Sequence, residues 1–352
     1  MTDTMPVRIG EELDKSSLER FIRQEISGLP DEEMIVKQFS SGASNLTYEL
    51  SIGSWKGVLR RPPHGPVAPK AHDMFREYTI LRALHPVFPI APKPFLYSDD
   101  QSIIDSSFFI MERRHGRILD TAFPDDITPT KERCRKISET MVDTLVRLHE
   151  VDYRQTELAK MTNPDGFMER QVHGWIKRYD QAKTDEIAEI DRLKAWLIAN
   201  IPPSQEATVI HYDYKLNNAM FSDDFTEVVG LFDWEMTTVG DPLADLGAAM
   251  SYWLEADDPD ALKYALGKPP VTVMSGFMTR EEFVDAYARK SGRDITHYPF
   301  YFTFALFKLA VICQQIYARW KHGYTTDERF AKLNRFVELL IQRAQNESEK
   351  TR

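Results

Sequence analysis

Two short polar clusters, 211-HYDYKLNNAMF-221 and 231-LFDWE-235, decide the fold of this chain. Each places Asp or Asn side chains beside apolar runs, so a metal, a phosphate and a substrate hydroxyl are all candidates for what they bind. The segment between them, 222-SDDFTE-227, has the composition of a tight turn. Apolar residues on both sides of this turn predict a β-hairpin.

The hairpin is expected to bring two oxygen ligands together. Asn218 and Asp233 lie almost symmetrically about the turn, and antiparallel strands are about 4.8 Å apart. A carboxylate and an amide oxygen suit Mg2+ that is held jointly with substrate phosphates and water. Asp213 could then accept the proton of an attacking hydroxyl, while Lys215 stabilises the charge that develops on the phosphate.

The composition is that of an ordinary globular enzyme. Of 352 residues, 42% are hydrophobic and 28% charged, which predicts one large core or two unequal lobes that share a cleft. The net charge of -10 argues against a general nucleic-acid or anionic-membrane binder. Neither cysteine has disulfide or zinc-ribbon spacing, the N-terminus lacks a signal-peptide core, and the apolar run 304-FALFKLAVIC-313 is too short to span a bilayer. We expect a cytoplasmic protein that binds neither nucleic acid nor membrane, and the sequence does not indicate its oligomeric state.

The sequence changes character near residues 113–116. Before that point, short β-branched and aromatic runs predict five strands and one helix. The strands are expected at 34–39, 46–52, 55–60, 95–100 and 107–113, and the helix at 70–85. After it, helical periodicity dominates, and 298–320 is apolar nearly all round, as in a buried core helix. The prediction is an α+β fold with a small β-rich N-terminal lobe, 1–113, built from a five-stranded antiparallel sheet and one helix, and a larger helical C-terminal lobe, 114–352, that contains both polar clusters.

The Asp, Lys and Asn spacing in 213-DYKLNN-218, with His211 before it, resembles the catalytic loop of the protein-kinase-like fold. Together with 231-LFDWEMTTVGDPLADLG-247, it resembles the aminoglycoside phosphotransferase family, including the related kinase-like domains that are joined to acyl-CoA dehydrogenases. The resemblance covers most of the chain. It implies a two-lobed kinase-like fold, ATP or GTP as the phosphate donor, Mg2+, and a small-molecule hydroxyl as the acceptor. It also implies that the N-terminal lobe binds the nucleotide and that the C-terminal lobe carries the catalytic and metal loops.

The resemblance also implies a role for individual residues. In the helical lobe, Asp213 is the catalytic base, Asn218 and Asp233 are the magnesium ligands, and Asp245 is a buried brace for the catalytic loop. In the N-terminal lobe, four features are expected to contact the nucleotide. They are a phosphate-covering loop with Ser44 and Asn45, a cation on a strand, Arg60, its ion-pair partner on a helix, Glu77, and an adenine-binding hinge with Met111 and Arg113.

Several positions depart from the family pattern. The loop 40-SSGASNLTY-48 has one glycine, so fewer unhindered backbone N–H groups are offered to phosphate. Arg60 replaces the usual kinase lysine, which keeps the charge and adds a bidentate fork. Tyr212 replaces a glycine common in the family, and Trp234-Glu235 stands where protein kinases have Phe-Gly. Glu235 could contact magnesium or substrate, or only cap the next segment.

Three functions are consistent with these residues. The first is a kinase for a small-molecule hydroxyl, either aminoglycoside-like or a metabolite such as a hydroxyacyl thioester. The second is a catalytically weak kinase fold that binds nucleotide. The third is a metal-dependent hydrolase using His211, Asp213 and Asp233, although no second histidine lies nearby and His211 is expected to be structural. Aromatic side chains such as Trp175 and Tyr252 could belong to the core or to an acceptor pocket.

Overall fold

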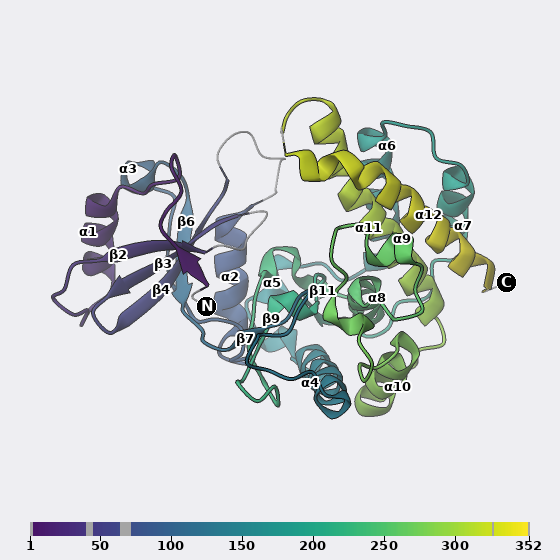
Figure 1. The fold of residues 1–352 in the computed structure, drawn as a ribbon, viewed down its shortest axis with the longest axis horizontal. Coiled ribbons are helices and arrows are strands. Elements are labelled where there is room, and N and C mark those ends of the chain that lie inside the picture. Colours follow the sequence, from purple (N-terminus) through teal and green to yellow (C-terminus); the bar gives the residue numbers. More distant parts are fainter. Residues whose placement is uncertain (1–2, 40–44, 64–71, 326, 351–352) are drawn as a thin grey trace. The chain divides into compact units, whose positions relative to one another are not determined.

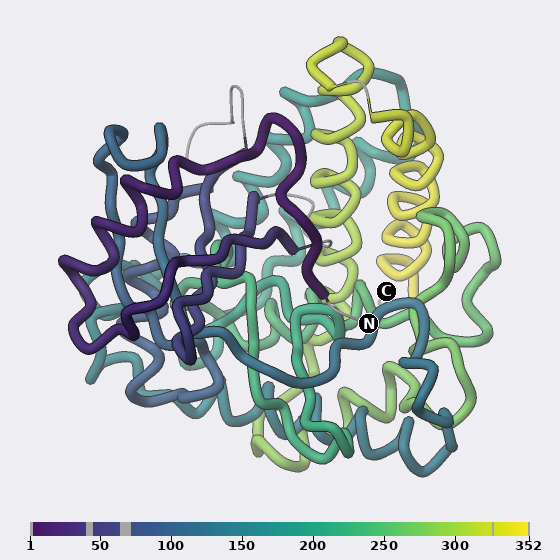
Figure 2. The backbone as a smooth tube through the Cα atoms, turned by 60° about the vertical axis from the view of Figure 1, so that its left-hand side comes forward, coloured from purple at the N-terminus to yellow at the C-terminus, as the bar shows by residue number. Residues whose placement is uncertain are grey.

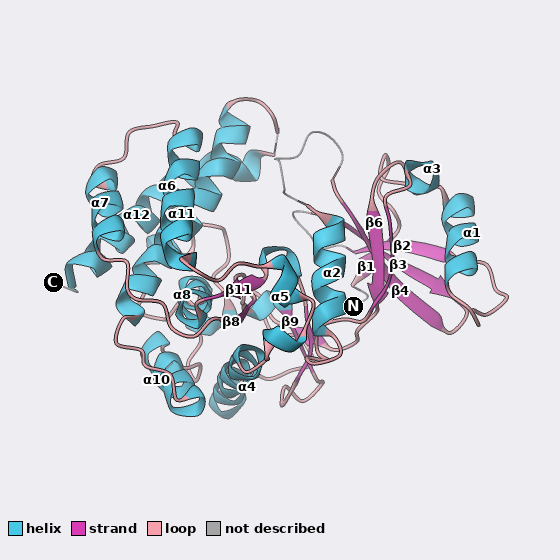
Figure 3. Cartoon of the chain, turned by 180° about the vertical axis from the view of Figure 1, so that it is seen from behind, coloured by secondary structure: helices cyan, strands magenta, loops and turns pink. Residues whose placement is uncertain are grey.

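The computed structural model describes residues 3–39, 45–63, 72–325 and 327–350. The chain divides into two compact units, each with its own core. One consists of Met1–His115 with Val229–Glu235, and the other of Gly116–Val228 with Met236–Arg352. The first is built around a β-sheet and the second is mainly helical (Figure 3). The α+β kinase-like fold class predicted from the sequence is confirmed.

The N-terminal unit contains an antiparallel sheet with the strand order β1-β2-β3-β4-β6-β5, counted over the residues that the structure describes (Figure 1). Its strands are β1 (Thr4–Met5), β2 (Ile35–Phe39), β3 (Leu46–Ile52), β4 (Trp55–Arg61), β5 (Pro94–Ser98) and β6 (Phe108–Glu112). Its helices are α1 (Lys15–Glu25), α2 (Met74–Leu84) and α3 (Gln101–Ile104). The expected five strands and one helix are therefore too few: β1 is too short to leave a periodic pattern, and the amphipathic segment that forms α1 was overlooked.

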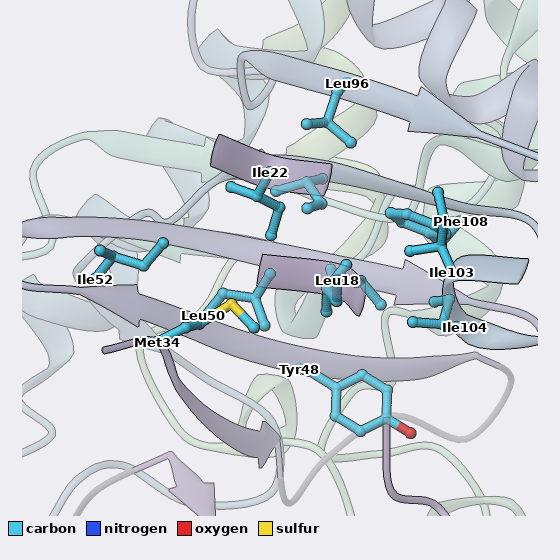
Figure 4. Close-up of a cluster of buried hydrophobic side chains, with 12 residues drawn as sticks. Leu18, Ile22, Met34, Tyr48, Leu50, Ile52, Leu96, Ile103, Ile104 and Phe108 are labelled. Atoms are coloured by element: carbon cyan, nitrogen blue, oxygen red, sulfur yellow. The ribbon is translucent and has the colours of Figure 1, made fainter. Parts of the chain in front are cut away.

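Helix α1 covers one face of this sheet. Its N-terminus is capped by Asp14, whose carboxylate accepts a hydrogen bond from the Ser17 backbone N–H. Leu18 and Ile22, four residues apart and therefore on one face of the helix, are fully buried with strand residues such as Leu50 (Figure 4). Truncating one such side chain to alanine removes about 2–5 kcal/mol of folding free energy.

The second unit is assembled around a long apolar helix. Its elements are β7 (Arg117–Ile118), α4 (Lys131–His149), α5 (Leu158–Met161), α6 (Phe167–Ala182), α7 (Ile190–Ala199), β8 (Thr208–Ile210), β9 (Ala219–Phe221), β11 (Thr238–Gly240), α8 (Pro242–Tyr252), α9 (Asp260–Lys263), α10 (Arg280–Ser291), α11 (Tyr298–Lys321) and α12 (Leu333–Lys350). Helix α11 packs against α6, α8 and α12, and α11 and α12 lie side by side (Figure 2). The predicted core helix is confirmed.

Helix α11 is longer than the apolar run 304–313 indicated. In length and composition it is able to cross a bilayer, but 78% of its most apolar window is buried inside the protein. Such burial is typical of the central helix of a helical core. The run 304–313 is too short to span a membrane, as expected, but the helix that contains it, Tyr298–Lys321, is long enough. The interpretation of this helix as a core element is confirmed.

The predicted turn between the two polar clusters is present. Strand β9 ends at Phe221 and β10 (Val228–Leu231) follows. The backbone N–H of Ser222 donates to the carbonyl of Glu227 at 2.9 Å, and Asp224 accepts hydrogen bonds from both Ser222 and Thr226. Side-chain acceptors of this kind are why Asp and Ser favour tight turns.

Candidate active site

The loop from His211 to Asn218 follows a buried strand of the helical unit. Strand β8 is fully buried and pairs antiparallel with β11, with Ile210 opposite Thr238. The chain then turns through a 3-10 helix at Leu216–Asn218 before it enters β9. The loop is thus fixed at both ends by strands.

Within this loop, two donors converge on the Asp213 carboxylate. Lys215 Nζ lies 2.9 Å from Asp213 Oδ2, and the Asn218 side-chain N–H donates to the same oxygen at 2.9 Å. Asn218 also donates to the Asp213 carbonyl at 2.8 Å. Because its amide nitrogen donates to Asp213, the side-chain oxygen of Asn218 is the atom that could serve as a ligand. The structure therefore brings together Asp213, Lys215 and Asn218, as the sequence predicts.

Asp245, in the first turn of α8, binds the backbone at the beginning of the loop. Its two carboxylate oxygens accept the backbone N–H groups of Tyr212 and His211, both at 2.7 Å. Burial alone raises the pKa of Asp245, but the hydrogen bond and charge of His149 and the His211 backbone outweigh burial and lower the pKa below its usual value. Asp245 therefore stays ionised while fully buried.

His149 is a functional neighbour that the sequence reasoning missed. Its Nε2 lies 3.1 Å from Asp245 Oδ2, and its Nδ1 lies 2.7 Å from the Tyr287 hydroxyl oxygen. This histidine ends α4, whose amphipathic pattern was recognised in the sequence. Its partner is ninety-six residues away along the chain, and no sequence spacing indicates such a pair.

His211 contributes to the loop as a structural residue. The imidazole is fully buried, and its Nδ1 accepts the backbone N–H of Asp213 at 3.3 Å. A metal-dependent hydrolase would need this side chain as a ligand. Among the described residues, no group of three or more His, Cys, Asp or Glu side chains is arranged to hold a metal ion. The His211 side chain is thus used within the loop, where it accepts the Asp213 backbone N–H.

Tyr212 adopts a conformation that usually belongs to glycine. Its φ is +66°, in the left-handed region, where a residue with a side chain costs about 1–2 kcal/mol relative to glycine. Glycine would adopt the same φ without this cost. The surrounding hydrogen bonds must hold the tyrosine in this state.

In the N-terminal unit, Arg60 of β4 forms the centre of a second polar cluster. Its Nη1 lies 2.7 Å from Glu77 Oε1 on α2, and its Nη2 lies 3.2 Å from Asp233 Oδ1. Arg60 and Glu77 are both buried, and Arg60 Nε has no hydrogen-bond partner within the part of the chain that the structure describes. Burial raises the pKa of Glu77, although Arg60 opposes the rise, and Asp233 adds to it. The buried Arg60 Nε and the clustered charge fit a site that binds a charged group.

The other predicted nucleotide contacts have mixed placements. Ser44 lies outside the described residues. The Asn45 side chain donates to Glu235 at 3.4 Å, and its oxygen lies 2.7 Å from His72 Nδ1. Met111 is a buried residue of β6.

Arg113 is held within the N-terminal unit by acidic and aromatic neighbours. Its Nε donates to Glu49 at 2.9 Å, and its guanidinium also pairs with Asp3. The guanidinium carbon lies 4.9 Å from the centre of the Phe39 ring. These contacts connect β2, β3 and the N-terminal segment, so the Arg113 side chain has a structural role.

A cavity of about 360 Å³ opens beside the catalytic loop, inside the helical unit. Its wall is mainly apolar, with Leu262, Phe302 and Leu306 among the lining residues, and Lys215 reaches it from the loop. Lys215 Nζ also lies 4.9 Å from the centre of the Tyr252 ring. Of the described residues that line the cavity, five are basic and one, Asp120, is acidic. Its volume is in the range of small-molecule sites, about 300–1,000 Å³.

The chain is similar in sequence to known proteins. Residues 35–294 match the model of the phosphotransferase enzyme family. The chain is 34% identical over 343 residues to acyl-CoA dehydrogenase family member 11 of Gallus gallus, in an alignment that covers 94% of this chain and 43% of that protein. The chain therefore spans less than half the length of this curated relative.

Two solved structures have the same fold. One, from Ralstonia eutropha JMP134 and classed as an aminoglycoside phosphotransferase, is 27% identical with a TM-score of 0.79, and covers 96% of this chain and 99% of its own. The other, choline kinase from Cryptosporidium parvum Iowa II, is 13% identical with a TM-score of 0.62, and covers 96% of both chains. The second likeness is one of fold alone.

Proposed function

Because the chain belongs to the phosphotransferase enzyme family, we propose that it is a magnesium-dependent kinase that transfers the γ-phosphoryl group of ATP to a hydroxyl of a small molecule. GTP is the alternative donor. The observation that carries the proposal is the convergence of Lys215 and Asn218 on the Asp213 carboxylate, at 2.9 Å each. A carboxylate fixed in this way serves phosphoryl transfer, in which positioning and electrostatics supply most of the rate.

In this proposal, Asp213 is the general base. Lys215 and Asn218 both contact Oδ2, so Oδ1 is the oxygen that receives the acceptor's proton. Lys215 would stabilise the negative charge that develops on the transferred phosphoryl group. When bound, magnesium–ATP supplies the phosphoryl group and neutralises part of its charge.

Asn218 and Asp233 are proposed as the magnesium ligands. The Asn218 amide is already oriented through its nitrogen, and Asp233 is held by Arg60 at 3.2 Å. Hard oxygen ligands of this kind suit magnesium shared with phosphate and water. Arg60 is proposed to bind the α- and β-phosphates, and Asn45, Met111 and the backbone near Arg113 to contact the nucleotide.

The cavity favours an acceptor with an apolar body. The apolar wall suits an aliphatic or acyl chain better than a polycationic aminoglycoside. Four of the five basic lining residues are paired with carboxylates, and Lys268 is the fifth. The name of the avian relative refers to acyl-CoA chemistry, which adds support. We therefore propose that a hydroxyacyl thioester or a related amphiphilic alcohol is a better acceptor than an aminoglycoside.

An ATP-consumption screen tests this proposal. The acceptors should include aminoglycosides, amino alcohols, sugars and hydroxyacyl thioesters of increasing chain length. The proposal expects turnover with hydroxyacyl thioesters, with activity that increases with chain length until the cavity is filled. Turnover only with aminoglycosides would contradict the acceptor assignment but not the kinase assignment.

A second candidate function is a nucleotide-binding module with little catalysis. It is favoured by the ion pair between Arg60 and Asp233, because the pair occupies one oxygen of the proposed metal ligand. A thermal-shift titration with ATP and Mg2+ separates the two candidates. Binding without transfer to any acceptor in the screen would favour the module.

A further inference from the structure

The catalytic loop contains a strained residue whose carbonyl is held by a buried cation. Tyr212 immediately precedes Asp213 and has a φ of +66°. On one side of Tyr212, Asp245 accepts its backbone N–H at 2.7 Å. On the other side, Lys308 Nζ donates to the Tyr212 carbonyl at 2.8 Å. The two contacts fix both peptide groups that flank this residue.

Lys308 belongs to the apolar core helix α11 and is only 3% exposed. Its ammonium lies 3.6 Å from the centre of the Tyr212 ring and 5.7 Å from that of Trp175 on α6. The same cation therefore contacts both the backbone and the side chain of Tyr212. Such a cation is expensive to bury, and an apolar residue of similar size would serve the core better.

We propose that Lys308 is a positioning residue for phosphoryl transfer, which clamps the Tyr212 peptide in its left-handed conformation and so aims the Asp213 carboxylate at the acceptor hydroxyl. This inference rests on the proposed kinase function. It explains how a tyrosine is held in a conformation that glycine adopts without strain: the clamp from α11 replaces the conformational freedom that glycine would supply.

The charge state of Lys308 links this clamp to pH. The pKa of Lys308 is lowered to about 8, mainly by burial; Asp213 and Asp245 oppose the shift, and the nearby cations Lys215 and Arg178 add to it. Because the pKa of Lys308 in the folded protein is below its ordinary value of 10.5, the protein gains stability as pH rises from about 8 to 10.5. Neutral Lys308 holds the Tyr212 carbonyl less strongly. Activity is therefore expected to fall over the pH range in which stability rises. Loss of activity by unfolding would instead be accompanied by a loss of stability.

A double-mutant cycle between Lys308→Met and Tyr212→Gly tests the clamp. In the tyrosine background, Lys308→Met should lower kcat by about 10- to 100-fold and leave the KM for ATP unchanged, because a misaligned base slows chemistry more than binding. In the Tyr212→Gly background, the same change should cost less than about 3-fold, because glycine needs no clamp. An equal loss of kcat in both backgrounds would overturn the proposal.

A readout without activity separates this inference from the proposed function. Hydrogen exchange of the full chain should become faster in peptides that cover residues 208–218 in Lys308→Met, and return toward the wild-type rate in Lys308→Arg, which can still donate to the carbonyl. Unchanged exchange in this segment would overturn the clamp even if the kinase is active. If the wild-type protein transfers phosphate to no acceptor but exchange changes as expected, the clamp stands and the kinase function fails.

Discussion

The catalytic loop of the helical unit and the Arg60 cluster of the N-terminal unit are held by different kinds of contact. In the helical unit, the catalytic loop is held by short hydrogen bonds from the backbone of His211 and Tyr212 to the buried Asp245. In the N-terminal unit, the Arg60 cluster is held by ion pairs between side chains, one of them to Asp233. Backbone contacts fix a loop independently of ligand, whereas side-chain pairs can exchange partners. The first cluster is thus preorganised, and the second is expected to rearrange when magnesium binds Asp233.

The largest expected effect comes from breaking the backbone contacts. Asp245→Asn places an amide N–H against the N–H of His211 or Tyr212, so one buried donor loses its acceptor. The cost is about 3 kcal/mol in the free energy of unfolding, with kcat reduced at least about 100-fold. Chemical denaturation and steady-state assays measure both. Asp224→Asn, in the exposed turn, is the matched control and should change stability by less than about 0.5 kcal/mol.

Acid should reproduce part of this effect in the wild-type protein. The pKa of Asp245 is lowered from 3.8, so its contribution to stability is present above that value and is lost as pH falls through the lower, folded pKa. Stability below pH 4 should therefore depend less on pH in Asp245→Asn than in the wild type. An identical acid limb in the two proteins would show that Asp245 is not held ionised in the fold.

A smaller effect is expected from the side-chain cluster. Glu77→Gln keeps a hydrogen-bond acceptor for Arg60 but removes the charge, so Arg60 is expected to turn more fully to Asp233. The KM for ATP should rise by about 10-fold, with a loss of stability of about 2 kcal/mol. Glu19→Gln on α1 breaks the more exposed pair with Arg23 and should change stability by less than about 0.5 kcal/mol. Equal effects of the two variants would contradict a special role for the buried pair.

Arg60→Lys should have a still smaller effect. Lysine keeps the charge but cannot contact Glu77 and Asp233 with one planar fork. We expect a rise of a few fold in the KM for magnesium–ATP, measured at saturating acceptor, with kcat changed less. A loss of kcat as large as that of Asp245→Asn would mean that the two clusters are equally preorganised.

The least effect is expected at the cavity. Lys268, a basic lining residue, should attract an acceptor that carries an anionic group. Lys268→Glu should raise the KM for such an acceptor by a few fold, less at high salt, and leave the KM for ATP unchanged. Lys37→Glu, on β2 of the other unit, is the charge-matched control. If the two variants had the same KM for this acceptor, Lys268 would not attract an anionic group of the acceptor.

The sequence was sufficient for the fold class and for the local part of the site. Asp213, Lys215 and Asn218 lie within six residues, so their spacing alone indicates that they meet, and the core helix is evident from its apolar surface. Contacts between distant segments were not predictable in this way. His149 joins Asp245, and Arg113 joins Glu49 and Asp3, only because the fold brings them together.

Lys308 is an intermediate case. It was visible in the sequence as a lone cation in an apolar run, and a charged residue in such a position is a signal of a specific partner. The partner, the carbonyl of Tyr212, could not be identified because backbone groups leave no sequence signature. The second signal was Tyr212, a tyrosine where the sequence resemblance leads one to expect glycine. The structure shows that Lys308 contacts this tyrosine.

The central claim is that Asp213 is the base of a phosphoryl transfer, and Asp213→Asn tests it most directly. The variant should be assayed with the best acceptor from the screen, and its binding of magnesium–ATP should be measured by calorimetry. We predict that transfer falls by about 100- to 10,000-fold while the affinity for magnesium–ATP changes by less than about 3-fold. Phosphoryl transfer at the wild-type rate by Asp213→Asn would contradict the account.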